Sequence, residues 1–557
     1  MRELRIFGPP GSGKTTKLAT EEIPNAAKAF GPEKVLIASY SRTAAKEIAS
    51  KKSRITGEAI SIPKENVGTL HSLCYRALGS PVVAESKKKE WNDDFGAQYP
   101  MGTGGSISID DGFDEPAYGS EGDELLSRVN IYRARLVDRK LWPAKVQHFY
   151  NKWEAFKTAH GYIDFADMID LACQRVIYPP GNPDVMFFDE AQDFTPLQLK
   201  LVRSWGNFVK WFVMVGDDDQ TIYRFSGASP EAFLQPALES KYIRVLDQSW
   251  RVPQTVLDKS MAMISRVKNR QIKEYRPRAD QDGLPVAGSV VRHSGNYKQP
   301  ERFVNEIIDK SKDRTVMIIA SCSYMIDPIK HLLKSKGVPF CNHYRKKRAD
   351  WNPLLSGGDE KVNAVDLVNA FLSNGPDGYY WTVEEFLKWA KFIRVSDNGL
   401  QRKKGNAGLK FLSDAVDAQA EGLESVRNIL AKILSQDAIE PALGRNISWL
   451  MDNVQPKRRE GLEYPIKVFQ NMGSEVLNKK PNITLGTIHS VKGGEASSVY
   501  LMPDISIKAV KENRTDREAI DAMHRLFYVG MTRAYDELVL MSRGSKPSIG
   551  GKLYVEW

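Results

Sequence analysis

The chain has 557 residues, of which 42% are hydrophobic and 27% charged, the ordinary range for globular proteins and enough for three or four domains. The formal net charge of +10 favours a polyanionic partner such as nucleic acid without requiring one. The four cysteines (Cys74, Cys173, Cys322, Cys341) lie far apart. Their spacing excludes a zinc ribbon, an iron–sulfur cluster and a disulfide scaffold, and it predicts a reducing compartment.

The N-terminal residues enter an apolar strand and a glycine loop at once, which leaves no room for a signal peptide. No run of about 18 apolar residues is present, so we expect no membrane span. We therefore expect a soluble, cytoplasmic protein.

Short apolar runs alternate with helix-like segments such as Thr43–Lys51 and Pro196–Trp205. This alternation predicts an α/β fold with parallel sheets, whose ligands gather at the carboxyl ends of the strands. The predicted strands are Leu4–Phe7, Val35–Ala38, Val185–Phe188, Phe212–Val215, Val316–Ile319, Val499–Met502 and Leu538–Met541.

Two stretches, 80–164 and 346–464, interrupt the alternation and are predicted to be mostly helical insertions. The first contains Met101–Gly122, which is rich in Gly, Ser and Asp and predicts a loop. The second stretch and its boundary carry three basic clusters: Arg345–Arg348, Arg402–Lys404 and Lys457–Arg459. These clusters could hold duplex nucleic acid, although charged runs are more often solvated faces.

A phosphate-binding loop is predicted directly after the first strand. The loop fits the pattern G-x-x-x-x-G-K-S/T and opens a helix, so its backbone N–H groups and the helix dipole would surround a phosphate. Lys14 would reach the β- and γ-phosphates, and the Thr15 hydroxyl would hold Mg²⁺. The predicted nucleotide-binding residues here are Gly8, Pro9, Pro10, Gly11, Ser12, Gly13, Lys14, Thr15 and Thr16.

Two adjacent carboxylates, Asp189 and Glu190, end a later apolar strand. Without the upstream phosphate loop, a solvated acidic turn would be the better interpretation. With the loop, we expect Asp189 to bind Mg²⁺ and Glu190 to polarise the attacking water.

Further motifs in order along nearly the whole chain resemble those of a superfamily 1 helicase of the UvrD/Rep/PcrA type. Ala38–Ala45 resembles the family's TFTNKAA, Gly68–Ser72 its GTFHS, Asp164–Met168 its DFDDL, Val215–Tyr223 its VGDDDQSIY, Gln248–Arg251 its QNYR, Thr487–Glu495 its TLHSAKGLE and Tyr528–Ala534 its YVGVTRA.

The resemblance implies two RecA-like parallel-sheet domains, each with a mostly helical inserted subdomain. We expect the first domain at 1–79 and 165–275, interrupted by the insertion 80–164. We expect the second at 276–345 and 465–557, interrupted by the insertion 346–464.

The resemblance also implies further nucleotide-site residues. Gln220 would sense the γ-phosphate, while Arg251 and Arg533 would reach it from the second domain as arginine fingers. Trp250 stands where the family stacks a tyrosine on the base, and Glu495 ends a motif at the same site. We therefore expect ATP and Mg²⁺ as cofactors, with Lys14, Asp189, Glu190, Gln220, Arg251 and Arg533 in catalysis.

Contacts with single-stranded nucleic acid are expected from aromatic and small polar side chains, because stacking on an aromatic tolerates any base. The resemblance assigns these contacts to Tyr40, Arg42, Thr69, His71, Tyr223, Phe225, Thr487 and His489. For an isolated aromatic residue, core packing would be the better interpretation.

The predicted function is an ATP-dependent DNA helicase that moves 3′→5′ on single-stranded DNA and unwinds duplex in replication, repair or recombination. Alternatives are a translocase that strips proteins from single strands without unwinding, and an NTPase switch or recruitment module. We expect single strands and single-strand/duplex junctions as partners. The family's adenine-reading glutamine segment has no counterpart before Gly8, which predicts relaxed nucleotide choice. A compact chain of this kind suits a phage or mobile-element enzyme or a defence-associated helicase.

Overall fold

The computed structural model describes residues 3–40, 48, 61–103, 120–345, 348–355, 362–373, 381–400, 427–428, 430–431, 433–513, 516–545 and 554–557. They form two compact units, Met1–Val290 with Ile507–Glu537, and Val291–Ser506 with Leu538–Trp557.

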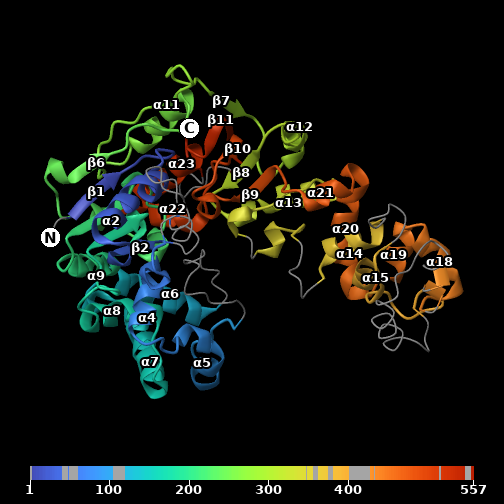
Figure 1. Ribbon diagram of the computed structural model, residues 1–557, viewed down its shortest axis with the longest axis horizontal. Coiled ribbons are helices and arrows are strands. Elements are labelled where there is room, and N and C mark those ends of the chain that lie inside the picture. The colour runs from blue at the N-terminus through green and yellow to red at the C-terminus, as the bar shows by residue number, and fades with distance from the viewer. Residues whose placement is uncertain are drawn as a thin grey trace. The chain divides into compact units, whose positions relative to one another are not determined.

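The first unit is built on a six-stranded sheet with the order β3-β2-β4-β5-β1-β6 (Figure 1). Every adjacent pair in this sheet is parallel. Its strands are β1 (Glu3–Phe7), β2 (Val35–Ser39), β3 (Val67–Thr69), β4 (Val185–Asp189), β5 (Trp211–Gly216) and β6 (Ile243–Val245).

The first unit's helices, in chain order, are α1 (Lys14–Lys17), α2 (Ile23–Phe30), α4 (Leu70–Ala77), α5 (Lys88–Phe95), α6 (Glu121–Ala134), α7 (Ala144–His160), α8 (Phe165–Arg175), α9 (Pro196–Gly206), α10 (Pro230–Leu234), α11 (Gln254–Ile264), α22 (Ile507–Asn513) and α23 (Arg517–Met531).

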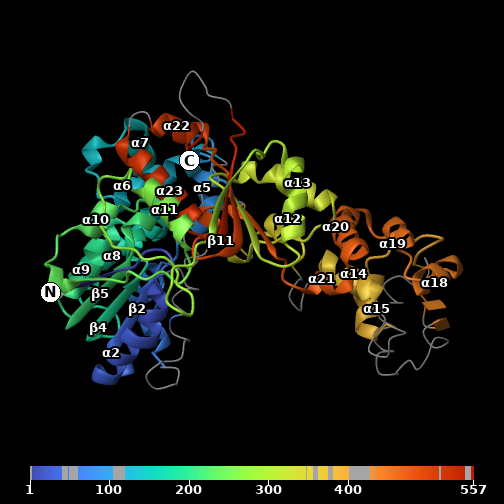
Figure 2. The ribbon, with the colours of Figure 1, turned by 90° about the horizontal axis from the view of Figure 1, so that it is seen from above.

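Both faces of this sheet are buried, as the nearly continuous apolar strands predict. Val35 and Ile37 of β2 pack with the α2 side of the sheet, whereas Leu36 and Ala38 pack with α4, α8 and α9. Figure 2 shows α2 on one side of β2 and β4, and α8 and α9 on the other. The carboxyl ends of the strands are therefore left for chemistry.

Helices α5, α6 and α7 form the insertion between β3 and β4. Their core is aromatic, with Trp91 and Trp153 in edge-to-face contact at 5.2 Å and Phe149 and Phe156 packed around them.

The second unit has a five-stranded sheet with the order β7-β11-β10-β8-β9. Strand β8 pairs in parallel with both β10 and β9. The strands are β7 (Ser289–His293), β8 (Val316–Ala320), β9 (Ile483–Thr487), β10 (Ala496–Leu501) and β11 (Ala534–Met541).

A helical insertion lies between β8 and β9 of the second unit. Buried aromatic side chains fill it, including Phe371, Trp389 and Trp449. The unit's helices are α12 (Val304–Lys310), α13 (Asp327–Ser335), α14 (Ala364–Leu372), α15 (Val383–Ala390), α18 (Gln436–Leu443), α19 (Ile447–Asn453), α20 (Pro456–Met472) and α21 (Ser474–Asn478).

The α/β prediction with two parallel sheets and helical insertions is confirmed, and each apolar run predicted to be a strand lies within or overlaps an observed one. Pro196–Trp205 falls in α9. Most of the predicted helix Thr43–Lys51, with the exception of Ile48, and most of the predicted loop Met101–Gly122 lie outside the described residues.

The compact units differ from the expected domains in two respects. The first unit extends to Val290 rather than to 275, and it also includes Ile507–Glu537, which was expected in the second domain. The physical reason is that α23 packs its buried face against α11. The six-part division remains a prediction.

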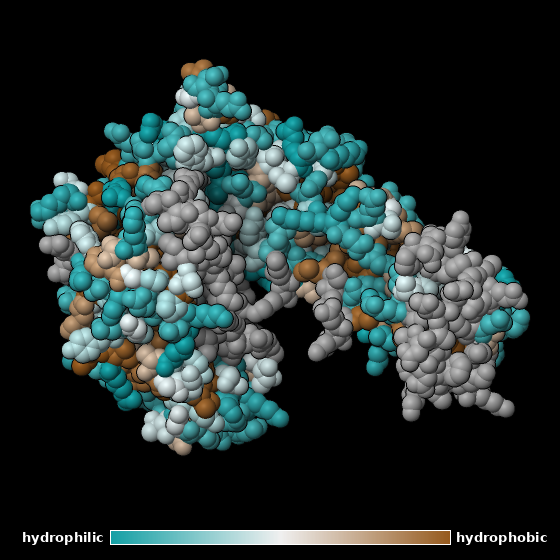
Figure 3. Space-filling model, in the orientation of Figure 1, coloured by the Kyte–Doolittle hydropathy of each residue, from teal (hydrophilic) through white to brown (hydrophobic). Residues whose placement is uncertain are grey.

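Among the described helices, none combines the length and the apolar character that a membrane crossing requires. The face seen in Figure 3 is mostly hydrophilic or neutral, with hydrophobic residues in small patches.

Candidate nucleotide and nucleic-acid site

The phosphate loop joins β1 to α1 at the carboxyl end of the first sheet. Gly8 donates its N–H to the carbonyl of Gly216 at 3.1 Å, which ties the start of the loop to the end of β5. Lys14 Nζ donates to the carbonyl of Gly8 at 2.6 Å. A Cβ on Gly8 would lie 2.3 Å from Lys14 Cγ, so the absence of a side chain at Gly8 lets Lys14 lie across the loop.

The segment Ser249–Arg251 lies directly against this loop. Trp250 N–H donates to the carbonyl of Gly11 at 2.8 Å, and Ser249 Oγ donates to that of Pro10 at 3.1 Å. Gly11 has φ +77°, and a Cβ there would lie 2.6 Å from Arg251 Cβ. Glycine is thus required at this position both for its backbone conformation and for the close approach of Arg251.

Trp250 is 67% exposed and lies beside Gly13. A large exposed aromatic at the rim of a phosphate loop is a suitable platform for a nucleotide base.

Thr15 and Asp189 come together as a pair. Thr15 Oγ1 donates to Asp189 Oδ2 at 3.0 Å, and Asp189 is fully buried. Burial, followed by the charge of Glu190, raises the pKa of Asp189 to about 7, against the opposing effects of Lys14 and Thr15. Asp189 Oδ1 accepts no hydrogen bond of standard geometry from the described residues. Hard oxygen donors of this kind fit Mg²⁺.

Glu190 occupies a strained backbone position with φ +53° and ψ +36°, which non-glycine residues seldom adopt. Its Oε2 accepts a 2.6 Å hydrogen bond from Gln192 Nε2, and Gln192 Oε1 accepts one from the N–H of Asp217 at 3.0 Å. Gln192 therefore orients the proposed base and joins it to the next strand. Gln192 was not among the residues predicted from the sequence, although it lies only two positions after Glu190.

Gln220 and Arg533 are hydrogen-bonded inside the first unit. Arg533 is 1% exposed, and its Nη2 donates to Gln220 Oε1 at 3.3 Å. Gln220 Nε2 donates in turn to Asp217 Oδ2 at 2.8 Å. Both Arg251 and Arg533 belong to the same compact unit as the phosphate loop, whereas we expected them to reach it from the second domain. The reason for Arg533 is the packing of α23 on α11 and on the turn Asp218–Gln220.

Among the described residues, two groups of three carboxylates resemble metal-binding sites, but basic side chains of the protein already pair with the carboxylates. In the first, Lys273 Nζ lies within 3.0 Å of Asp217, Asp218 and Asp219.

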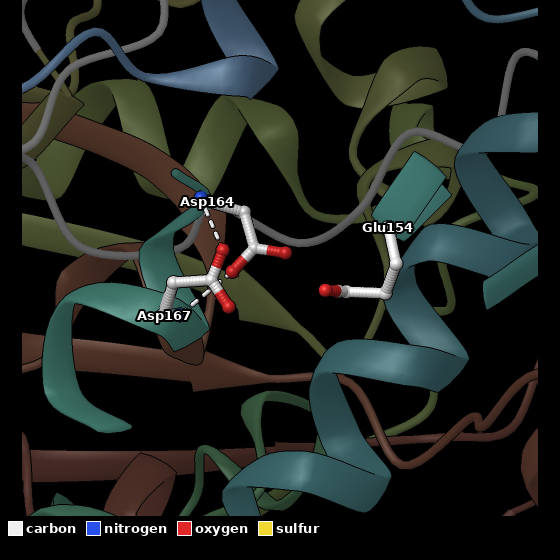
Figure 4. Close-up of side chains that lie close together, drawn as sticks. All are labelled: Glu154, Asp164 and Asp167. Carbon is white, nitrogen blue, oxygen red and sulfur yellow. Dashed lines mark hydrogen bonds between the residues drawn. The ribbon is translucent and has the colours of Figure 1, made fainter. Parts of the chain in front are cut away.

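The second group is Glu154, Asp164 and Asp167, from α7 and the start of α8 (Figure 4). Asp164 and Asp167 accept each other's backbone N–H and so cap α8. Lys157 and Arg133 pair with both. The motif Asp164–Met168 therefore anchors the helical insertion to α8.

Three of the predicted nucleic-acid residues form an aromatic group. Tyr40 stacks on Tyr223 with ring centroids 4.8 Å apart, and Phe225 meets Tyr223 edge to face at 5.8 Å. Tyr223 is 6% exposed, so it supports the group and leaves Tyr40 and Phe225 as the more accessible rings.

The remaining predicted nucleic-acid contacts lie in two equivalent turns. Gly68–Ser72 and Gly486–Ser490 share the pattern G-T-x-H-S and begin in the last two residues of β3 and β9, each of which is an edge strand of its sheet. In each turn the serine donates its N–H to the threonine Oγ1 at 3.2 Å and its Oγ to the threonine carbonyl. This repeat, one copy in each unit, was not recognised from the sequence.

These turns bury Thr69 and Thr487 and place His71 and His489 two residues after them. Burial lowers the pKa of His71 to about 4, so its ring is neutral at pH 7. A neutral histidine offers a phosphate or sugar a hydrogen bond rather than a charge.

The other predicted site residues are placed as follows. Thr16 lies in α1, and Glu495 is an exposed residue of the second unit. Arg42 lies outside the described residues.

Two known protein families match separate parts of the chain. A family described as "AAA domain" matches residues 2–226, and one described as "UvrD-like helicase C-terminal domain" matches residues 415–544. Together the two matches support a UvrD/Rep-type superfamily 1 helicase. For this UvrD-like chain, the two sheets with their helices are the two RecA-like domains of the family.

Relatives of this UvrD-like chain are distant. It is 24% identical over 307 residues to YjcD of Bacillus subtilis, covering 51% of this chain and 39% of that protein. It is 25% identical over 436 residues to the ATP-dependent DNA helicase UvrD2 of Mycobacterium tuberculosis, covering 74% and 56%. It is 22% identical over 458 residues to the ATP-dependent DNA helicase Rep of Escherichia coli, covering 70% and 66%. The chain thus spans less than two thirds of the length of each of these relatives.

Proposed function

We propose that this chain is an ATP-driven DNA helicase that moves 3′→5′ along single-stranded DNA and separates the duplex ahead of it. One observation above all supports the proposal. The turn that begins with Asp217 carries Gln220, which is hydrogen-bonded to Arg533, and, three residues later, Tyr223 of the aromatic group. A single short segment therefore connects the nucleotide to the expected DNA surface.

The nucleotide chemistry proposed for the first unit follows from its side chains. Lys14 binds the β- and γ-phosphates, and the Thr15 and Asp189 oxygens hold Mg²⁺, which supplies charge neutralisation to the phosphates. Glu190 accepts the proton of the attacking water, and Gln192 keeps its carboxylate in place. Arg251 and Arg533 stabilise the charge that develops on the transferred phosphoryl group.

The proposed coupling between nucleotide and DNA runs through α23. At its C-terminal end Arg533 bonds Gln220, and at its N-terminal cap Asp516 forms an ion pair with Arg224. Arg224 lies between Tyr223 and Phe225. A change in the contacts of Gln220 on hydrolysis is therefore transmitted to both ends of the turn that bears the aromatic rings.

Single-stranded DNA is the proposed track. Tyr40 and Phe225 offer rings for base stacking, and the two G-T-x-H-S turns offer equivalent polar contacts to the backbone. The 3′→5′ direction, the preference for single-strand/duplex junctions and a role in replication, repair or recombination are proposed from the family resemblance.

Nucleotide choice is proposed to be relaxed. Trp250 offers the base a stacking surface, which every purine and pyrimidine can use, rather than a hydrogen-bonding edge. Comparable kcat/KM values for ATP, GTP and CTP are expected, and a strong preference for ATP would contradict the idea.

ATP hydrolysis with and without single-stranded DNA tests the function. Strong stimulation by DNA supports a motor, and Lys14→Ala should abolish the turnover. No stimulation would favour an NTPase switch. A forked duplex with a trap for the released strand then distinguishes unwinding from translocation that only removes bound proteins.

A further inference from the structure

The segment Gln271–Tyr275 follows α11 and belongs to no helix or strand. Its residues alternate in exposure: 272 and 274 are exposed, whereas 271, 273 and 275 are buried or partly buried. Ile272 is 81% exposed, whereas Lys273 is only 6% exposed. Residues 271, 273 and 275 thus face inward, toward the acidic turn and the phosphate loop.

The inward face contacts the acidic turn (Asp217, Asp218, Asp219), whose three carboxylates are fully buried. Lys273 Nζ lies 2.5 Å from Asp218 Oδ1, 2.9 Å from Asp217 Oδ1 and 3.0 Å from Asp219 Oδ2. The N–H of Gln271 donates to Asp218 Oδ2 at 2.8 Å. Unpaired charges at such depth are strongly unfavourable, so Lys273 is required for this turn to adopt its conformation.

A continuous series of polar contacts leads from Lys273 through Asp217 to Gln220 and Arg533, the residues expected to contact the γ-phosphate. Asp217 uses one carboxylate oxygen for Lys273 and the other for Gln220 Nε2, at 2.8 Å. Gln220 Oε1 then accepts from Arg533 at 3.3 Å. Because its nitrogen and oxygen are both engaged, the Gln220 amide has one defined orientation.

The same segment also reaches the phosphate loop. The Tyr275 hydroxyl donates to the carbonyl of Pro10, which Ser249 Oγ also contacts. Two residues of one short segment, Lys273 and Tyr275, therefore contact the glutamine turn and the phosphate loop.

We propose that Lys273 is a positioning residue for ATP hydrolysis, which orients Gln220 toward the γ-phosphate by holding the carboxylate of Asp217. This inference rests on the proposed ATPase function of the site. Lys273 lies outside the sequence motifs that mark the nucleotide site, and it acts through Asp217 rather than on the nucleotide.

Arg270 provides a matched comparison within the same cluster. It pairs with Asp219 through Nε at 2.7 Å, and its hydrogen bonds and ion pairs do not include Asp217. Removing Arg270 perturbs the charge of the acidic turn but leaves the link from Lys273 through Asp217 to Gln220 intact.

The test measures DNA-stimulated ATP hydrolysis and thermal unfolding of the full chain. The wild type is compared with the single variants Lys273→Met, Asp217→Asn and Arg270→Gln and with the double variant that combines Lys273→Met and Asp217→Asn. Misplacement of a catalytic group should lower kcat about 10- to 100-fold in Lys273→Met, with KM for ATP changed less than about twofold. Arg270→Gln should stay within about threefold of the wild-type kcat. Because Lys273 acts through Asp217, the double variant should lose no more than the worse single variant.

Asp217→Asn keeps Lys273 paired with Asp218 and Asp219, so it tests the link even if Lys273→Met does not fold. A wild-type kcat in Asp217→Asn or in folded Lys273→Met overturns the proposal, as do equal losses in Lys273→Met and Arg270→Gln. Multiplicative losses in the double variant also overturn it. An inactive wild type instead overturns the proposed function, and this inference with it.

Discussion

Replacing Arg533 by alanine tests the chemistry of the nucleotide site most sharply. The side chain is buried at the end of α23 and bonds Gln220 Oε1 at 3.3 Å and the carbonyl of Val529 at 3.0 Å. Alanine removes a guanidinium whose position is already fixed, and it also removes the hydrogen-bond donor to the Gln220 oxygen.

The expected loss follows from the role of such an arginine in phosphoryl transfer. An arginine finger contributes about 10³–10⁵ in rate, which corresponds to about 4–7 kcal/mol of transition-state stabilisation. Loss of the two buried charged hydrogen bonds of Arg533 costs about 3–6 kcal/mol of stability. The loss of kcat therefore reports the chemical role of Arg533 only in protein that stays folded and still binds nucleotide and DNA.

The assay is steady-state ATP hydrolysis at saturating single-stranded DNA, with binding of a fluorescent nucleotide measured separately. Arg525→Ala is the matched control, because Arg525 is a buried arginine within α23 and its Nη2 donates to the backbone carbonyl of Asn269 at 2.8 Å. Arg533→Ala should lose at least about 10³ in kcat while nucleotide and DNA binding persist. A kcat within tenfold of the wild type, or equal losses in the two variants, would refute the assigned role.

Three further predictions concern Glu190, Arg251 and Glu85. Glu190→Gln should bind ATP normally and stop hydrolysis, and retained turnover in rapid-quench assays would remove Glu190 as the base. Arg251→Ala should cut DNA-stimulated hydrolysis with little change in DNA affinity by fluorescence anisotropy; normal hydrolysis would exclude it as a finger. Burial and the charge of Asp164 raise the pKa of Glu85 to about 8, so the folded state holds this proton more tightly and stability falls as pH rises from about 4.5 to 8. Between pH 5 and pH 9, the free energy of unfolding measured with urea should fall by about 3–5 kcal/mol more in the wild type than in Glu85→Gln. Equal pH profiles for the two proteins would contradict a raised pKa of the buried Glu85 carboxyl.

The phosphate loop and the buried strands could be predicted from sequence because their signals are local. Gly8 to Thr15 fixes a loop by its spacing alone, and the apolar run ending at Asp189 fixes both a strand and the position of its carboxylate. Strand β8 was likewise apparent from four consecutive apolar residues.

Features that depend on tertiary contacts could not be predicted. The membership of Arg533 in the first unit depends on the packing of α23 on α11, which no local pattern encodes. Lys273 is one lysine among many until the fold surrounds it with three aspartates. The strained backbone of Glu190 follows neither from its identity nor from that of its neighbours.

The paired G-T-x-H-S turns lie between these two cases. The five-residue pattern is short enough to pass unnoticed between positions 68 and 486, yet both copies begin at the end of an edge strand and form the same hydrogen bonds. Their equivalence became apparent only when β3 and β9 were both placed at a sheet edge.

Strand separation on tailed duplexes tests the central claim most directly. With ATP and Mg²⁺, a duplex bearing a 3′ single-stranded tail should be unwound, whereas the same duplex with a 5′ tail should stay paired, and Lys14→Ala should unwind neither. Preferential unwinding of the 5′-tailed duplex, or no unwinding of either by a protein that hydrolyses ATP, would contradict a 3′→5′ DNA helicase.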